Sequence, residues 1–145
     1  MRILNKKAKF KYFILEKFEA GIVLTGAEIK SIRAGRVDLS EAFSRIKDGE
    51  VYLFNAFINP WMGSEKYSTA RRERKLLLHK KQILTLIGKL AKGSFTLVPT
   101  SVYIKGNLAK VEIAIAKSKA KFDRRMDLKK RTIDRDVERE LRGQK

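Results

Sequence analysis

The side chains that could do chemistry in this chain of 145 residues are mainly its lysines and arginines. There are 34 of them against 16 Asp and Glu, which gives a formal net charge of +18. The surplus gathers in residues 1–12, 70–81 and 117–145. Basic clusters of this kind neutralise phosphates and release the counterions that surround nucleic acids. The pattern therefore predicts a polyanion-binding protein, with nucleic acid as the favoured partner.

Catalytic chemistry is not indicated. His79 is the only histidine, and the absence of cysteine excludes thiolate metal sites and a Cys nucleophile. No motif that presets a nucleophile, a base or a metal is present. Asp38 and Glu41 could together hold Mg²⁺ for a nuclease, but we favour roles for them at a helix end and a turn. We therefore expect a protein without enzymatic activity or cofactor, and keep a metal-dependent ribonuclease as a distant alternative.

The composition also bears on location. No run approaches the ~20 apolar residues that a membrane span needs. The basic clusters also lack the apolar stripe of a helix that lies on lipid. A chain without cysteine fits a reducing compartment. We expect a cytoplasmic protein that binds no membrane.

Aromatic residues favour RNA over DNA as the partner. No expected helix carries the row of Arg, Asn and Gln that reads the major groove of DNA. A small barrel with aromatic faces instead suits unstacked bases in RNA loops. Tyr12, Trp61 and Tyr67 are candidate stacking platforms, although Tyr12 fits the core equally well.

The elements that must position these residues begin with a strand. An aromatic and β-branched run over 12–24 predicts a strand that bends near Gly21. Thr25 and Glu28 then have the spacing of a capping box, which begins a helix that ends at Gly35. A hairpin follows, with arms over 42–47 and 50–58. Its turn is Asp48-Gly49, and both faces of its second arm are largely apolar.

A second helix and a second hairpin complete the domain. The helix is expected to begin near His79, with Gln82 at its third position and with Ile83, Ile87, Leu90 and Ala91 toward the core. The hairpin joins 95–105 to 108–117 through Gly106-Asn107. Pro99 predicts an edge or a bulge. Alternation in the last arm predicts that Val111, Ile113 and Ile115 are buried, and that Lys110, Glu112 and Ala114 are solvated.

The last segment differs from the rest. Residues 1–117 form the expected domain, whereas 118–145 hold only a thin apolar stripe of Ile133, Val137 and Leu141. Such a segment cannot build a core of its own. We expect a basic tail that is disordered when free and folds as a helix on a charged surface.

Four segments in order resemble the SmpB family, the partners of transfer-messenger RNA in bacteria. They are NKKAKFKYFILEKFEAGIVLTGAEIKSIRAG (5–35), DGEVYLFNAFINP (48–60), RERKLLLHKKQI (72–83) and KFDRRMDLKKR (121–131). The resemblance implies a mainly β fold: a six-stranded, OB-like closed barrel with two or three flanking helices and the basic tail. It also implies an RNA-binding adaptor for trans-translation, which rescues stalled ribosomes. The second hypothesis is a structural ribosomal or assembly protein built on the same barrel.

The same resemblance names partners and residues. The adaptor would bind the tRNA-like domain of transfer-messenger RNA at the elbow formed by the D-loop. It would enter the ribosome at the decoding centre and the mRNA channel of 16S rRNA, together with elongation factor Tu and as a monomer. The RNA-binding residues, carried over by position, are Asn5, Lys6, Lys7, Glu19, Arg74, Lys75, Leu77 and His79.

Several of these positions have a purely structural alternative. Glu19 could accept hydrogen bonds from base edges, fix a nearby Arg, or simply pair with Lys17 or Lys30. His79 could only cap its helix, and Leu77 could be a core residue.

The resemblance assigns the tail to the ribosome. Phe122 would stack on a ribosomal base, and Arg124 and Arg125 would pair with rRNA phosphates. The full set of ribosome-binding residues is Lys119, Lys121, Phe122, Asp123, Arg124, Arg125, Lys129, Lys130, Arg131, Arg135 and Arg139.

Overall fold

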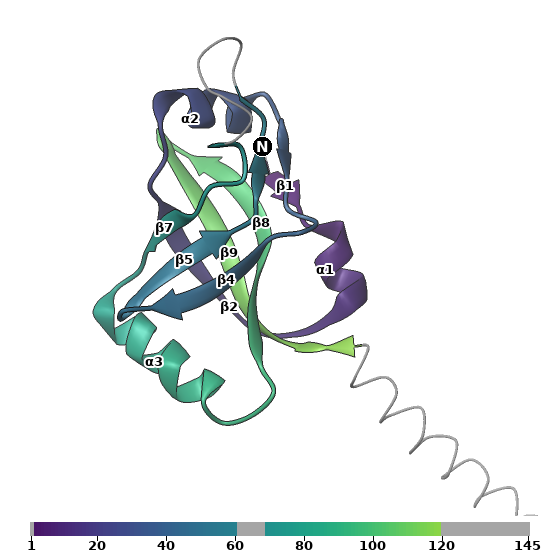
Figure 1. Cartoon of the computed structure of the whole chain (residues 1–145), viewed down its shortest axis with the longest axis vertical. Coiled ribbons are helices and arrows are strands. Elements are labelled where there is room, and N and C mark those ends of the chain that lie inside the picture. The colour runs from purple at the N-terminus through teal and green to yellow at the C-terminus, as the bar shows by residue number, and fades with distance from the viewer. Residues whose placement is uncertain (1, 61–68, 120–145) are drawn as a thin grey trace, which may run out of the picture.

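The computed structural model describes residues 2–60 and 69–119, and its centre is a ring of six strands. Each strand hydrogen-bonds to the next, and β8 also pairs with β9, which closes the ring (Figure 1). The mainly β fold with six strands in a closed arrangement is therefore confirmed. In order around the ring, the strands are β8 (Thr96–Lys105), β4 (Phe43–Lys47), β5 (Glu50–Phe54), β7 (Arg74–Leu77), β2 (Tyr12–Ile22) and β9 (Leu108–Ser118).

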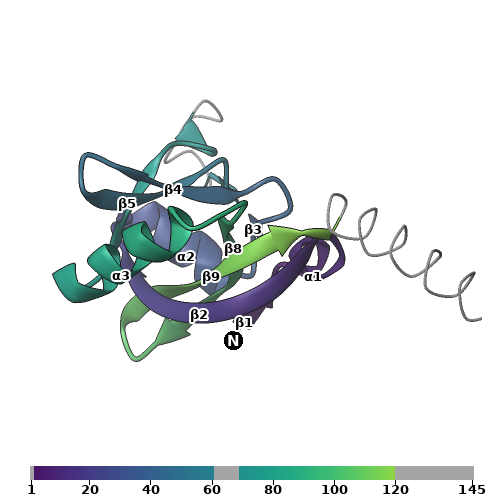
Figure 2. The same ribbon diagram turned by 90° about the horizontal axis from the view of Figure 1, so that it is seen from below.

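Three helices and three short strands lie around this ring. Helices α1 (Lys6–Lys11) and α3 (Lys80–Leu90) are on opposite sides of it, as both ribbon views show (Figures 1 and 2). Helix α2 (Gly26–Arg33) follows β2. Strand β1 (Arg2–Leu4) pairs with β8, and β3 (Val37–Asp38) pairs with β6 (Phe57–Ile58). Within the described ranges, no helix is long and apolar enough to cross a membrane.

The two predicted helix starts are confirmed. Thr25 Oγ1 accepts from the Glu28 backbone N–H at 3.2 Å, and Glu28 Oε1 accepts from the Thr25 N–H at 2.9 Å. This reciprocal pair satisfies two of the amides that a helix leaves free at its start. Helix α3 begins directly after His79, as predicted. Gly35 follows α2 with φ 74°, the left-handed conformation expected after its last turn.

The expected strand over 50–58 is broken at Asn55. Asp48 and Gly49 have φ 53° and 76°, so the predicted turn of the first hairpin is confirmed. Asn55 also has a positive φ, 60°, and this reverses the alternation of faces. As a result Val51 and Leu53 before the break, and Ala56 and Ile58 after it, are all buried in the core.

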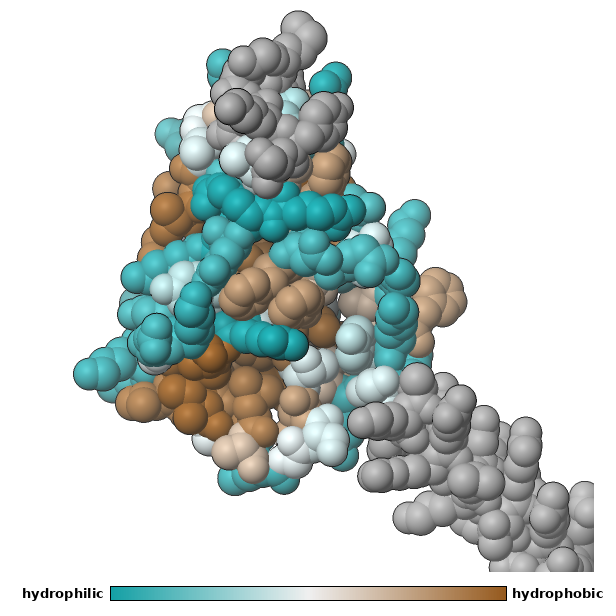
Figure 3. Space-filling model, viewed as in Figure 1, coloured by the Kyte–Doolittle hydropathy of each residue, from teal (hydrophilic) through white to brown (hydrophobic). Residues whose placement is uncertain are grey.

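The predicted inner face of α3 was wrong in part. Ile83 and Leu86 are buried, whereas Ile87 and Ala91 are exposed. The helix turns its 83, 86 and 90 positions inward, an i, i+3, i+7 stripe instead of the predicted i, i+4 one. Hydrophobic side chains consequently gather on the surface over α3, at the lower left of Figure 3, and the exposed Leu84 and Ile87 belong to this helix.

The second hairpin was predicted correctly except at one face of β9. The register of β8 and β9 shifts between Pro99 and Ser101, the bulge that the proline predicts. Ala114, expected to be solvated, is fully buried. Near this end the outer face is covered by α1, whose Ala8 packs with Val98 and Ala116. The sequence analysis did not predict α1, because six residues rich in lysine show no apolar period.

The predicted boundary between domain and tail lies close to the end of β9. That strand extends to Ser118, one residue beyond the expected limit. The expected tail helix lies outside the described residues, apart from Lys119.

Candidate nucleic-acid interface

One cleft brings together three predicted residues that are far apart in the sequence. Glu19 of β2, Leu77 of β7 and His79 before α3 all line a cavity of about 810 Å³. The pairing of Gly21 with Leu77 across β2 and β7 places these elements side by side. The second hairpin completes the wall. The other lining residues are Gly21, Ile22, Val23, Leu24, Ile29, Leu78, Gln82, Asn107, Leu108, Ala109 and Lys110.

Leu77 lies on the surface of the cleft and not in the core. Its side chain is 52 % exposed, and Val23 and Leu108, which also line the cleft, are exposed large apolar residues. The absence of a side chain at Gly21 leaves room for Leu77, because a Cβ added at Gly21 would lie 3.3 Å from Leu77 Cβ. Exposed apolar side chains that meet in one concave surface are typical of a binding site. The alternative of Leu77 as a core residue is therefore wrong.

Glu19 is held by neighbours that the sequence analysis did not name. Its Oε2 accepts a hydrogen bond from the Tyr103 hydroxyl, and its Oε1 lies 3.5 Å from Lys105 Nζ. The Tyr103 hydrogen bond and the Lys105 charge lower the pKa of Glu19 below its ordinary value, so the side chain is ionised at neutral pH. Of the alternatives considered for Glu19, pairing with Lys17 is wrong, since Lys17 lies 3.5 Å from Glu112 and Glu19 pairs with Lys105.

His79 begins a helix and also lines the cleft. Its backbone N–H donates to Gln82 Oε1 at 3.1 Å, so the residue begins α3. Its exposed side chain also lines the cleft. Lys110 adds a cation to the same wall. The cleft thus offers apolar surface, one carboxylate, one imidazole and one ammonium group.

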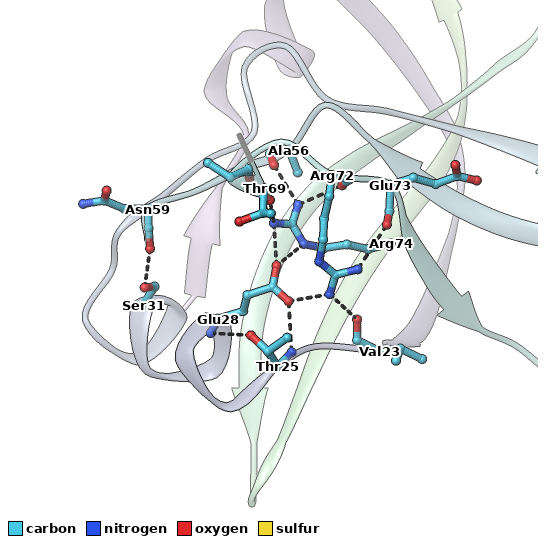
Figure 4. A network of polar contacts seen from close by, with 11 residues as sticks. Val23, Thr25, Glu28, Ser31, Ala56, Asn59, Thr69, Arg72, Glu73 and Arg74 are labelled. Atoms are coloured by element: carbon cyan, nitrogen blue, oxygen red, sulfur yellow. Dashed lines mark hydrogen bonds and ion pairs between the residues drawn. The ribbon is translucent and has the colours of Figure 1, made fainter. Parts of the chain in front are cut away.

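Arg74 is buried and does not lie on the surface. Its side chain is 0 % exposed, and its Nε donates to the buried carboxylate of Glu28 at 2.5 Å. The guanidinium also donates to the backbone oxygen of Ala56 at 2.9 Å (Figure 4). It donates to the backbone oxygen of Ala70 at the same distance. An arginine enclosed in this way has no open face for a phosphate. The prediction of an RNA contact for Arg74 is corrected to a structural role.

The buried pair also supports the cleft. Arg72 donates to the second oxygen of Glu28 and lies within 3.5 Å of the backbone oxygen of Val23, a residue of the cleft wall (Figure 4). Burial raises the pKa of Glu28, but the hydrogen bonds from Arg72 and Thr25 and the charge of Arg74 outweigh it and lower that pKa. Sequence analysis assigned Glu28 only to the cap, because no local pattern connects it to residues more than 40 positions away.

Asn5 is likewise buried. Its Nδ2 donates to the backbone oxygens of Leu39 at 3.1 Å and Pro99 at 2.8 Å, and its Oδ1 accepts from the Ala8 N–H. These contacts start α1 and fix it to the ring. The structure therefore gives Asn5 a structural role in place of the predicted RNA contact.

The remaining predicted lysines lie outside the cleft. Lys6 and Lys7 are on α1, across the ring from α3 (Figure 2). Lys7 Nζ is 2.8 Å from Glu41, one of the two acids considered for Mg²⁺, and Asp38 accepts from the Ser40 N–H. Lys75 is half-exposed on β7, and its Nζ lies 3.9 Å from Glu50. In residues 2–60 and 69–119, no group of three acids or histidines is placed to hold a metal ion.

Little of the predicted tail lies in the described residues. Lys119 donates to the Lys9 backbone oxygen at 2.9 Å, and its ammonium lies 5.1 Å from the centre of the Phe13 ring. Tyr12 packs partly buried against the Ala8 cluster, as its core alternative predicts. The remaining candidates lie outside the described residues: Lys121, Phe122, Asp123, Arg124, Arg125, Lys129, Lys130, Arg131, Arg135, Arg139, Trp61 and Tyr67.

Comparison with known proteins identifies the family. The SmpB protein family model matches residues 2–143. The SsrA-binding protein of Halothermothrix orenii is 48 % identical over 136 residues, which cover 93 % of this chain and 88 % of that protein. The SsrA-binding protein of Shouchella clausii is 52 % identical over 139 residues, which cover 95 % and 89 %.

A solved structure gives the same result. One chain of "tmRNA-SmpB: a journey to the center of the bacterial ribosome" is 45 % identical to this chain, with a TM-score of 0.69. The match covers 81 % of this chain and 84 % of that one. On the evidence of sequence and fold together, the chain belongs to the SmpB family.

Proposed function

We propose that this protein binds transfer-messenger RNA and delivers it to stalled ribosomes for trans-translation. Its relatives in Halothermothrix orenii and Shouchella clausii are SsrA-binding proteins, and the similar solved chain comes from work on tmRNA and SmpB in the ribosome. The observation that carries the proposal is the convergence of Glu19, Leu77 and His79 on one cleft. The role is that of an adaptor, without a catalytic step or a cofactor.

The chemistry of the cleft suits a folded RNA loop. Unstacked bases present flat apolar faces to side chains such as Leu77 and Leu108. The edges of these bases carry N–H groups, from which the ionised Glu19 carboxylate can accept hydrogen bonds. Lys110 and the exposed lysines elsewhere supply the attraction to phosphates that every RNA shares. Glu19 thus gives the protein a preference for one RNA, whereas Lys6, Lys7 and Lys75 contribute affinity for any RNA.

The second half of the proposed function lies in the C-terminal segment. Its basic residues would contact 16S rRNA at the decoding centre and in the mRNA channel, with Arg124 and Arg125 on phosphates and Phe122 on a base. The contact of Lys119 with Lys9 would fix the point where this segment leaves the ring. We further propose that the protein acts in the cytoplasm as a monomer and enters the ribosome together with elongation factor Tu.

Truncation separates RNA binding from delivery. A chain that ends at Lys119 keeps β9 whole, so its affinity for transfer-messenger RNA should stay within a few-fold of the full chain. Peptide tagging on ribosomes stalled in a reconstituted translation reaction should be lost. A truncated chain that still supports tagging would contradict the proposed role of the C-terminal segment. A loss of RNA affinity alone, with no tagging supported even by the full chain, would instead favour a structural ribosomal protein.

A further inference from the structure

Tyr103 and Glu19 meet across an intervening strand. Glu19 lies opposite Glu112 of β9, and Tyr103 lies opposite Lys110 on the other edge of the same strand. Neighbouring strands are about 4.8 Å apart, so two side chains separated by one strand meet only if one of them is long. Tyr103 spans this distance on the outer face and donates its hydroxyl proton to Glu19 Oε2.

The Tyr103 ring is itself fixed. Arg2 lies over it, with the guanidinium carbon 4.1 Å from the ring centre. Arg2 in turn donates to Ser101 Oγ at 2.9 Å and to Glu112 Oε2 at 3.3 Å. Burial and the Glu19 carboxylate raise the pKa of Tyr103 to about 12, so the hydroxyl is a donor throughout the neutral range. A donor on a fixed ring gives its acceptor a fixed direction.

The Glu19 carboxylate can still accept hydrogen bonds from a ligand in the cleft. Glu19 is 41 % exposed at the cleft, and its Oε1 has a longer contact, 3.5 Å, with Lys105 Nζ. Each carboxylate oxygen has two lone pairs, so both oxygens can accept further donors. A side chain that is already held in place loses less conformational freedom on binding than a mobile one.

We propose that Tyr103 is a positioning residue for RNA recognition. Its hydroxyl holds the Glu19 carboxylate in one orientation, from which it accepts N–H donors of bases in the cleft. The proposal rests on the function proposed above and adds to it a residue outside the cleft lining. Tyr103 touches Glu19 and not the RNA, so its effect appears as selectivity and not as general affinity.

The test compares two substitutions that remove the same hydroxyl group. Tyr103→Phe keeps the ring under Arg2, and Tyr52→Phe makes the same change on β5, outside the cleft. Each variant competes transfer-messenger RNA against an unrelated folded RNA of equal length. Tyr103→Phe should lower the preference for transfer-messenger RNA several-fold and leave affinity for the unrelated RNA unchanged. Tyr52→Phe should match the unsubstituted protein.

A double variant and a titration exclude a merely structural effect. If Tyr103 acts through Glu19, adding Tyr103→Phe to Glu19→Gln causes no further loss of preference. Carboxyl NMR of the free protein should place the pKa of Glu19 below its ordinary 4.5, and Tyr103→Phe should raise it. A raised pKa without any change in preference would overturn the proposal, and so would additive losses.

The same data separate this proposal from the function on which it rests. If the unsubstituted protein binds both RNAs equally, the proposed function fails and the role of Tyr103 in recognition fails with it. If the unsubstituted protein prefers transfer-messenger RNA and Tyr103→Phe keeps the whole preference, only the role of Tyr103 is contradicted.

Discussion

The guanidinium of Arg74 and the carboxylate of Glu28 face each other inside the protein, with Arg74 Nε 2.5 Å from Glu28 Oε2 and both side chains at most 3 % exposed. Two charges taken out of water are tolerated only when each satisfies the other and the remaining donors find acceptors. Here the remaining N–H donors of Arg74 bind the backbone oxygens of Ala56 and Ala70. The pair connects α2 to β7, and Arg72, which binds the same carboxylate, also lies 3.5 Å from the backbone oxygen of Val23 in the cleft wall.

Removing one partner should therefore destabilise the fold. Arg74→Met removes the fully buried one of the two arginines that bind Glu28, together with the guanidinium that donates to the backbone oxygens of Ala56 and Ala70, and we expect a loss of about 3–5 kcal/mol in the free energy of unfolding. Lys75→Met, next in sequence but half-exposed, should change it by less than about 1 kcal/mol. Urea unfolding followed by circular dichroism measures both. Equal stability of the two variants, with weaker RNA binding in Arg74→Met, would return Arg74 to the RNA interface.

The lowered pKa of Glu28 predicts how stability depends on pH. A carboxyl group whose pKa is lower in the folded than in the unfolded state contributes stability above its unfolded pKa, and loses it as pH falls through the folded pKa. Taking 4.5 as the unfolded value, this stability is fully present at pH 7 and declines at pH values below 4.5. Urea unfolding of the protein and of Glu28→Gln should differ most at neutral pH and converge in acid. A constant difference across pH 3–7 would contradict the ionised state of Glu28.

The exposed apolar surface of the cleft predicts a difference between two leucines. Leu77 is 52 % exposed in the cleft, and Leu84 is 60 % exposed on α3 outside it. Each methylene group that a base covers contributes about 0.8 kcal/mol, so Leu77→Ala should weaken binding to transfer-messenger RNA at least about five-fold. Leu84→Ala should not, as filter binding at fixed salt would show. If both variants bind like the parent, bases do not lie against the apolar part of the cleft.

Residues that act through neighbours in sequence could be predicted, and residues that act through distant ones could not. Thr25 and Glu28 make a helix cap within four positions, and Asp48-Gly49 makes a turn within two, so their patterns sufficed. Arg74 stands in a basic stretch of the sequence, beside Arg72 and Lys75. Only the fold shows that Glu28 lies opposite Arg74. The sequence therefore led to the wrong prediction that Arg74 lies on the surface.

The candidate site has the same limit. Glu19, Leu77 and His79 were named by resemblance to a family, since no spacing connects a residue of β2 with residues near α3. Tyr103 was missed because its hydroxyl acts across a strand pairing that the sequence does not reveal. Asn55 was missed because an apolar run on both of its sides predicts an unbroken strand.

The central claim is that the cleft distinguishes transfer-messenger RNA from other RNA through Glu19. Glu16 is a matched control, because it lies on the same strand with nearly the same exposure, 42 % against 41 %, and pairs with Lys89 away from the cleft lining. The measurement is competition between transfer-messenger RNA and an unrelated folded RNA of equal length, at rising salt, for the parent, Glu19→Gln and Glu16→Gln.

Charge alone gives both RNAs the same affinity and the same salt dependence. We expect the parent and Glu16→Gln to prefer transfer-messenger RNA about ten-fold or more at every salt concentration, and Glu19→Gln to lose most of that preference, because one acceptor for base edges is gone. Equal binding of both RNAs by the parent, or a Glu19→Gln variant as selective as Glu16→Gln, would contradict the account.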